Sequence, residues 1–233
     1  MTHVNDYDTF AEAYDADNER SVYNAHYERP ATLALVGPPA GLRVLDAGCG
    51  SGTLAQQLLA AGAQVTGLDA SRGLLEIARR RLGPDVELLH ADLDRPLPLP
   101  TGTFDVVVAS LVMHYLPDWG PPLAELRRVL VPGGRLVLST HHPFMDYQLA
   151  SRDDYLGVYE FTDRWERAGR TMEMRFWHRP LHAMVDAFTG AGFTVERLVE
   201  PRPQPEAREL SPEAYERLST RPHFIFFALR RPA

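Results

Sequence analysis

Short apolar runs alternate with longer segments of helical periodicity from residue 43 onward. The runs RVLD, QVTGLD, VELLH, FDVVVAS and GRLVLST predict five strands, at residues 43–46, 64–69, 86–90, 104–110 and 134–140. Between them, apolar side chains recur every three or four positions and predict helices over residues 53–61, 71–82 and 121–130. Strands that alternate with helices in this way are typical of a parallel sheet with crossover helices.

The carboxyl-terminal part of the chain begins with a change of pattern. Residues 141–179 are rich in aromatic, histidine and charged residues and keep no long regular period, which predicts an insertion after the fifth strand. Regular patterning returns with a helix over residues 180–191, and further strands are predicted over residues 193–200 and 223–231. These two strands bring the sheet to seven, so we expect a doubly wound, mostly parallel, Rossmann-like α/β fold.

Residues 1–40 form a separate segment ahead of the first strand. Their apolar side chains have helical spacing, and the segment contains Tyr7, Tyr14, Tyr23, His26 and Tyr27. We expect a helical cap that places these side chains over the carboxyl ends of the strands. The chain shows no internal repeat, and its length suits one domain over residues 1–233.

Composition and charge argue against several classes of protein. No apolar run approaches the roughly 20 residues that a membrane helix needs, and the stretch MTHVNDYDTF is polar and acidic, so we expect no membrane span and no export signal. Cys49 is the only cysteine, which excludes an intramolecular disulfide and a multi-cysteine zinc site and fits a reducing cytoplasm. The net charge of −7 disfavours nucleic acid as a partner. The basic run Arg79, Arg80, Arg81 is expected to be a solvated helix face.

The stretch VLDAGCGSGT, at residues 44–53, brings three glycines directly after the first predicted strand. Glycine adopts backbone angles closed to other residues and leaves no side chain between the backbone and a ligand. In an open parallel sheet, ligands bind beyond the carboxyl ends of the strands, where this turn lies. The turn therefore predicts a cradle for a ligand.

Two acidic residues near this turn indicate which ligand it holds. The third glycine comes one residue too early for the dinucleotide fingerprint Gly-x-Gly-x-x-Gly. Asp46 would repel a pyrophosphate, but it suits a positively charged amino group. Asp69 closes the second predicted strand, where an acidic side chain accepts hydrogen bonds from ribose hydroxyls. A cationic amino acid, a ribose and a shallow cradle describe S-adenosylmethionine better than a nicotinamide dinucleotide.

At these residues the chain resembles the class I S-adenosylmethionine-dependent methyltransferases. The resemblance runs over roughly residues 40–140, through VLDAGCGSG, VTGLDAS, ADLDRPLPLPTGTFDVVVASLVMHYLPD and ELRRVLVPGGRLVLST. The early stretch YDTFAEAYD also resembles the segment that many small-molecule members fold over the cofactor. The resemblance implies a small-molecule methyltransferase with S-adenosylmethionine as cofactor and S-adenosylhomocysteine as its product.

The same resemblance implies cofactor contacts at matching positions. By moiety, these are Asp46, Gly48, Cys49 and Gly50 for the methionine end, Asp69 for the ribose, Ala70, Leu74, Asp92 and Leu93 for the adenine, and Ser110, Leu111 and Tyr14 for the methionine and sulfonium side. Asp92 has the alternative of being merely solvated in an acidic loop. Tyr14 has the alternative of being a core residue of an amphipathic helix, and Cys49 is assigned no reactivity.

A methyl acceptor that starts protonated benefits from a general base, and histidine is the usual one near neutral pH. His114 follows the fourth predicted strand, and His141 and His142 follow the fifth, so these three are the candidate catalytic residues. For His114, support of the cofactor site is the alternative role. Adjacent histidines on an extended chain point in opposite directions, so we expect no metal site.

The substrate is predicted to lie against the insertion over residues 141–179. Phe144, Trp177 and His178 are its candidate wall residues, and the aromatic content suits a planar or apolar small molecule. The alternative for these aromatic side chains is an ordinary core. The partners expected are therefore a small molecule and, at most, a second copy of the chain, as monomer or homodimer.

Three functions remain open at this point. The first is a methyltransferase that acts on an oxygen, nitrogen or carbon atom of a small molecule. The second is a protein that binds S-adenosylmethionine without transferring the methyl group, either as a sensor or as a non-methylating enzyme. The third is a nicotinamide-dependent oxidoreductase, which the glycine spacing and Asp46 oppose.

Overall fold

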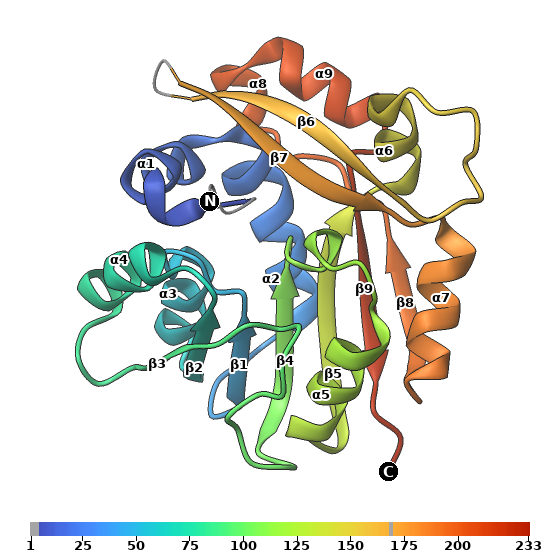
Figure 1. Ribbon diagram of the computed structural model, residues 1–233. Coiled ribbons are helices and arrows are strands. Elements are labelled where there is room, and N and C mark those ends of the chain that lie inside the picture. The colour runs from blue at the N-terminus through green and yellow to red at the C-terminus, as the bar shows by residue number, and fades with distance from the viewer. Residues whose placement is uncertain (1–4, 168–169) are drawn as a thin grey trace.

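The computed structural model describes residues 5–167 and 170–233, and its centre is a seven-stranded sheet (Figure 1). The strands, in the spatial order β3-β2-β1-β4-β5-β9-β8, are β3 (Glu87–His90), β2 (Gln64–Asp69), β1 (Arg43–Ala47), β4 (Phe104–Ser110), β5 (Leu130–His141), β9 (Phe224–Arg230) and β8 (Thr194–Val199). Strands β1 to β5 pair in parallel, and β9 is antiparallel to both β5 and β8. The predicted mostly parallel, seven-stranded α/β sheet is confirmed.

Helices cover both faces of this sheet. They are α2 (Arg29–Val36), α3 (Thr53–Ala60), α4 (Arg72–Leu82), α5 (Gly120–Val129) and α7 (Leu181–Gly190), whereas α8 (Ala207–Leu210) and α9 (Pro212–Thr220) lie above the sheet, at the top of Figure 1. Val44 packs with α2 and α3 on one face, whereas its neighbour Leu45 packs with α5 and α7 on the other. Both residues are fully buried, as expected for a central parallel strand that is covered on both faces.

Further elements lie over the carboxyl ends of the strands (Figure 1). From the amino-terminal segment these are η1 (Tyr7–Thr9), α1 (Ala11–Arg20) and the π-helix η2 (Asn24–Glu28), and from later in the chain η3 (Met113–Tyr115), α6 (Pro143–Ala150), β6 (Tyr159–Arg167) and β7 (Arg170–His178). A helical segment ahead of the first strand and an insertion after the fifth are both confirmed. Residues 1–4 of the predicted cap and 168–169 of the predicted insertion lie outside the described residues.

The insertion contains regular structure that the sequence analysis did not predict. Strands β6 and β7 form an antiparallel hairpin, separate from the main sheet, in which Phe161 pairs with Phe176. A signal was present, because Met172, Met174 and Phe176 alternate with polar residues at the period of a strand. The side chains of Phe161, Met174 and Phe176 are buried together beneath the hairpin.

The predicted boundaries of the fifth strand were too narrow. The prediction began at residue 134, but β5 begins at Leu130, because Phe104 already pairs with Leu130 while Val106 pairs with Arg135. The glycine-rich residues between these two pairs form a bulge within the strand.

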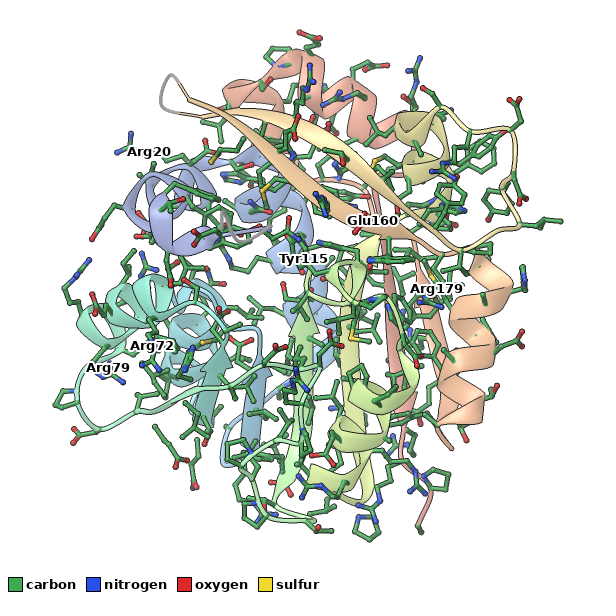
Figure 2. All side chains as sticks on the ribbon, in the orientation of Figure 1. Arg20, Arg72, Arg79, Tyr115, Glu160 and Arg179 are labelled. Atoms are coloured by element: carbon green, nitrogen blue, oxygen red, sulfur yellow. The ribbon has the colours of Figure 1, made fainter. Side chains whose placement is uncertain are left out.

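The basic run at the end of α4 was wrongly predicted to be only a solvated face. Arg79 is exposed at the edge of the molecule (Figure 2). Arg80, however, pairs with Glu12 of α1. Arg81 is largely buried and makes a two-pronged ion pair with Asp15 of α1, at 3.0 and 3.1 Å. The run therefore attaches the amino-terminal segment to α4.

Within the part of the chain that the structure describes, no helix is long and apolar enough to cross a membrane.

Candidate functional site

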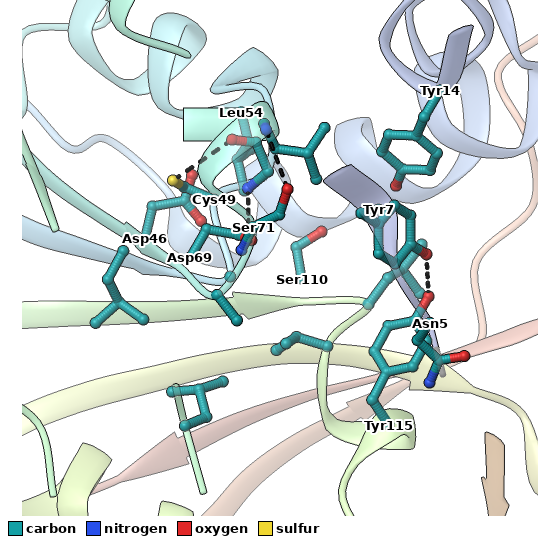
Figure 3. Close-up of a pocket in the computed structure, with 18 of the residues that line it drawn as sticks. Asn5, Tyr7, Tyr14, Asp46, Cys49, Leu54, Asp69, Ser71, Ser110 and Tyr115 are labelled. Carbon is teal, nitrogen blue, oxygen red and sulfur yellow. Dashed lines mark hydrogen bonds between the residues drawn. The ribbon is translucent and has the colours of Figure 1, made fainter. Parts of the chain in front are cut away.

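A cavity of about 540 Å³ lies at the carboxyl ends of β1 to β4, beneath the amino-terminal segment. The strands run parallel, so the turns that follow them open at one edge of the sheet. Figure 3 shows the two sides of the cavity: Asp46, Cys49, Asp69 and Ser71 on one side, Tyr7, Tyr14 and Tyr115 on the other, and Ser110 between them.

The glycine turn after β1 forms one wall of this cavity. Gly48 and Gly50 both have positive φ angles, of 82° and 55°. A Cβ atom at Gly48 would lie 2.8 Å from the Cγ2 atom of Val112, so the close packing of these two turns requires glycine. At Gly50 a Cβ atom would meet nothing within 4 Å, and this residue lines the cavity. The turn therefore offers bare backbone to a ligand.

Asp46 is the most unusual group in the cavity wall. Its side chain is 1% exposed, and neither carboxylate oxygen has a hydrogen-bond partner among the described residues. Burial, followed by repulsion from the carboxylates of Asp69 and Glu28, raises the pKa of Asp46 to about 7. A buried carboxylate without a partner is costly, and a cation in the cavity would supply the missing partner.

Asp69, at the end of β2, joins the two neighbouring turns. Its Oδ2 atom accepts a hydrogen bond from the Gly50 backbone N–H at 2.8 Å, and its Oδ1 atom accepts one from the Ser71 N–H at 2.8 Å. Burial raises the pKa of Asp69, while these backbone hydrogen bonds oppose the shift. Each oxygen keeps a lone pair for a hydroxyl donor, because a carboxylate has about four acceptor positions.

The amino-terminal segment closes the cavity from above. The Asp8 carboxylate accepts hydrogen bonds from the Ser71 hydroxyl and, at 2.8 Å, from the Gly73 N–H. The hydroxyl groups of Tyr7 and Tyr115 are hydrogen-bonded to each other, as the dashed line in Figure 3 shows. The Tyr14 ring packs edge-on against Tyr7, with ring centroids 4.8 Å apart. Aromatic side chains from two distant parts of the sequence thus form one wall.

Two charged wall residues were missed in the sequence analysis. Arg29 and Glu28 are 7% and 4% exposed and line the cavity from the start of α2 and the end of η2. Burial lowers the pKa of Arg29, and its guanidinium donates to the Asn18 side-chain oxygen at 3.2 Å. They lie in a stretch with ordinary helical spacing, so nothing local in the sequence marked them.

All of the predicted cofactor residues line this one cavity. They are Tyr14, Asp46, Gly48, Cys49, Gly50, Asp69, Ala70, Leu74, Asp92, Leu93 and Ser110. Leu111, also predicted, lines it as well. The structure brings these residues together, and their individual roles toward a cofactor stay predictions.

The three candidate catalytic histidines lie together behind this wall and are not among its lining residues. His114 is buried, and its ring stacks on His141 with centroids 3.8 Å apart. His141 Nδ1 lies 3.0 Å from an Asp146 oxygen, while His142 points away and its Nε2 lies 2.9 Å from a Glu200 oxygen. Burial lowers the pKa of both His114 and His142, which keeps these rings neutral.

The candidate substrate residues also lie outside the cavity lining. Phe144 is 52% exposed, and its ring lies beside those of Tyr147 and Tyr155 on the outer side of the insertion. His178 is fully buried, and its Nε2 atom lies 2.8 Å from the Tyr155 carbonyl oxygen. Trp177 is partly buried on β7 and pairs across the hairpin with Glu160. A substrate role for these three residues therefore stays a prediction.

No group of three or more histidine, cysteine, aspartate or glutamate side chains within residues 5–167 and 170–233 is arranged to hold a metal ion.

Comparison with known proteins identifies the central part of the chain. Residues 45–138 match the family model described as "Methyltransferase domain". A demethylmenaquinone methyltransferase from Clavibacter sepedonicus is 43% identical over 57% of this chain and 55% of the relative. A ubiquinone biosynthesis O-methyltransferase from Aromatoleum aromaticum is 38% identical over 49% of this chain and 52% of the relative. The chain thus spans about half the length of these curated relatives.

A solved structure extends the similarity over the whole fold. The S-adenosylmethionine-dependent methyltransferase from Mesorhizobium loti is 29% identical, with a TM-score of 0.71 over 92% of this chain and all of that one. In its matching domain, its relatives and this shared architecture, the chain is similar to class I S-adenosylmethionine-dependent methyltransferases.

Proposed function

We propose that this chain transfers a methyl group from S-adenosylmethionine to an oxygen, nitrogen or carbon atom of a small molecule. The observation that carries the proposal is the Asp46 carboxylate, buried without a partner in the wall of a cavity that the glycine turn and Asp69 complete. An ammonium group is the partner that this carboxylate needs, and S-adenosylmethionine has one. A pyrophosphate would meet repulsion from Asp46 at the same place.

The residues present fit the whole cofactor. Asp46, with the backbone of Gly48 to Gly50, would hold the amino group, and the cationic Arg29 would hold the carboxylate of the methionine moiety. Asp69 would accept from the ribose hydroxyls, and Asp92 with Leu93 would border the adenine. When bound, the cofactor supplies an electrophilic methyl group on a sulfonium.

The protein itself mainly supplies alignment and a dry cavity. Methyl transfer is an in-line displacement, and correct placement of two reactants removes much of the entropic part of its barrier. Tyr7 and Tyr14 line the cavity from above and meet Tyr115 of η3, so these three rings would shield a bound cofactor from water. Among the candidate bases, His114 contacts Tyr115 edge-on at 4.5 Å between centroids, so a general-base role is best tested first at His114.

The acceptor we propose is a planar or aromatic small molecule. The names of two relatives, a demethylmenaquinone methyltransferase and a ubiquinone biosynthesis O-methyltransferase, point to quinone-type rings. The three tyrosines of the cavity wall would pack against such a ring. We further propose that residues 1–233 act as one domain, as monomer or homodimer in the cytoplasm, with residues 1–40 as the cap and residues 141–179 on the substrate side.

The first experiment measures the melting temperature with S-adenosylhomocysteine and, separately, with NADH. A ligand at about a hundred times its dissociation constant stabilises a protein by about 2.7 kcal/mol, which raises the midpoint by several degrees. We expect a shift with S-adenosylhomocysteine alone. A shift with NADH alone would contradict the proposal.

A pair of aspartate variants provides the matched control. Asp69→Ala should abolish the shift, because it removes the acceptor at the end of β2 and the link to Gly50. Asp105→Ala removes an aspartate that pairs with Arg43 at the opposite end of the sheet, and it should keep the full shift. Equal shifts in the two variants would remove the structural basis of the proposal.

Turnover is then tested with quinol-type acceptors, with S-adenosylhomocysteine formation and product mass as the readouts. Formation of a methylated product is expected. Cofactor binding without product from any oxygen, nitrogen or carbon acceptor would instead favour a protein that binds S-adenosylmethionine without transferring its methyl group.

A further inference from the structure

Glu28 ends the π-helix η2, an element that in other proteins often marks a functional position. Its carboxylate is buried, and one oxygen, Oε1, accepts hydrogen bonds from three hydroxyl groups. The donors are Thr32 at 2.6 Å, Ser110 at 2.8 Å and Ser139 at 2.6 Å. They come from α2, β4 and β5, so this one side chain connects the amino-terminal segment to two central strands.

The strand end that Glu28 connects to is strained. Leu111, directly after β4, has a φ of 50°, in the left-handed region that leucine seldom adopts. Its backbone N–H donates to the Ser139 hydroxyl at 3.0 Å and to the Ser139 carbonyl at 3.1 Å. The Ser139 hydroxyl that accepts this backbone hydrogen bond also donates to Glu28 Oε1. The Glu28 carboxylate therefore orients the hydroxyl that holds Leu111.

The strained turn at Leu111 also sets the position of the glycine turn after β1. Val112 follows Leu111, and its side chain fills the space beside Gly48. A Cβ atom at Gly48 would lie 2.8 Å from the Cγ2 atom of Val112. Ser110, Leu111 and Val112 all line the cavity. A shift at Leu111 would move Val112 against the backbone that is proposed to hold the methionine moiety.

We propose that Glu28 is a positioning residue of the cofactor site. It acts through Ser139 and Ser110 to hold the turn at Leu111, and through Val112 it fixes the glycine turn. This inference rests on the proposed function, since it concerns the affinity of the same cavity for the cofactor. It also means that the cofactor cradle is complete only when the amino-terminal segment is docked.

The test uses two variants that each remove one hydroxyl from Glu28. Ser139→Ala and Thr32→Val both abolish a buried 2.6 Å hydrogen bond to Oε1, and neither residue lines the cavity. Only Ser139 is linked to Leu111. We expect Ser139→Ala to weaken S-adenosylhomocysteine binding about tenfold by calorimetry, and Thr32→Val to change it less than about twofold. Equal losses in both variants would show a merely structural role.

Two variants of Glu28 itself separate the effect of its three hydrogen bonds from the effect of its negative charge. Glu28→Gln keeps an oxygen that accepts the three hydroxyls, so its affinity should stay within about threefold of the wild type, while Glu28→Ala should lose about thirtyfold. The same loss in both variants would overturn the proposal. If Glu28→Ala does not fold, Ser139→Ala carries the comparison in its place.

A glycine at position 111 provides the decisive control. Glycine adopts a positive φ without strain, so the turn then needs less support. The loss of S-adenosylhomocysteine affinity caused by Ser139→Ala should therefore shrink to about threefold or less when the double variant is compared with Leu111→Gly alone. An undiminished loss in that background would contradict the inference. Failure of the wild type to bind S-adenosylhomocysteine would instead contradict the proposed function.

Discussion

The two halves of the cavity wall are built in different ways. The lower half consists of turns that follow β1, β2, β3 and β4, and each turn lies within a few residues of the strand that positions it. The upper half consists of the amino-terminal segment, whose contacts join distant residues, such as Asp8 with Ser71 and Tyr7 with Tyr115. The lower half therefore has a local sequence pattern, whereas the upper half depends on which surfaces the fold brings together.

The largest expected effect is in the lower half, at Gly48. Gly48→Ala should weaken S-adenosylhomocysteine binding about 100-fold, because the added Cβ collides with Val112 and the turn must move. Gly41→Ala is the control, since Gly41 has a similar positive φ of 77° but open space around a Cβ atom. Calorimetry on both variants measures the difference. A similar loss at Gly41 would show that backbone strain, and not the cavity wall, causes the effect.

The next effect concerns the charge of Asp46. Its pKa of about 7, against an ordinary 3.8, means that in the free protein the protonated acid predominates only below about pH 7. The contribution of Asp46 to the free energy of unfolding is therefore complete below about pH 4 and is lost as the pH rises through 7. A cationic ligand favours the carboxylate, so S-adenosylhomocysteine affinity should rise about tenfold between pH 6 and pH 8.

Two controls sharpen this pH profile. Asp46→Asn should bind S-adenosylhomocysteine about tenfold more weakly at pH 8 and show a flat profile, because the amide does not titrate. 5′-Methylthioadenosine lacks the amino acid, so its affinity for the wild type should not follow the pKa of Asp46. A steep profile in Asp46→Asn would assign the titration to another group.

Arg81 of α4, which attaches the upper half, should have a moderate effect on stability. Arg81→Gln removes the two-pronged ion pair with Asp15 and should lower the free energy of unfolding by about 1–3 kcal/mol, because both side chains are largely buried. Arg79→Gln, at the exposed start of the same run, should stay within about 0.5 kcal/mol of the wild type. Urea unfolding measures both, and equal effects would mean that the ion pair does not hold the cap.

The smallest expected effect is at the contact between the two halves. Tyr7→Phe removes the hydroxyl that bonds to Tyr115 and should weaken S-adenosylhomocysteine binding about threefold, as for one neutral hydrogen bond. Tyr23→Phe, outside the cavity lining, is the control and should bind normally. An unchanged affinity in Tyr7→Phe would show that the upper half closes without this contact.

The sequence predicted the parts of the fold that short segments encode. The strand β2 and the helix α4 lie where predicted, because apolar periodicity acts within a few positions. The hairpin of β6 and β7 was missed, since only one of its strands carries a clear alternation and its partner supplies the rest. Boundaries also failed at β5, where a bulge in the pairing extends the strand.

The site residues divide in the same way, into those that local sequence predicts and those that only tertiary contacts place. The sequence by itself determined the glycine turn and the acidic residues Asp46 and Asp69, because a parallel sheet brings the ends of its strands to one edge whatever the remaining chain does. Only the tertiary structure decided that Glu28 and Arg29 line the cavity and that the three histidines lie behind it. Those positions depend on contacts between residues far apart in the chain, and no local pattern records such contacts.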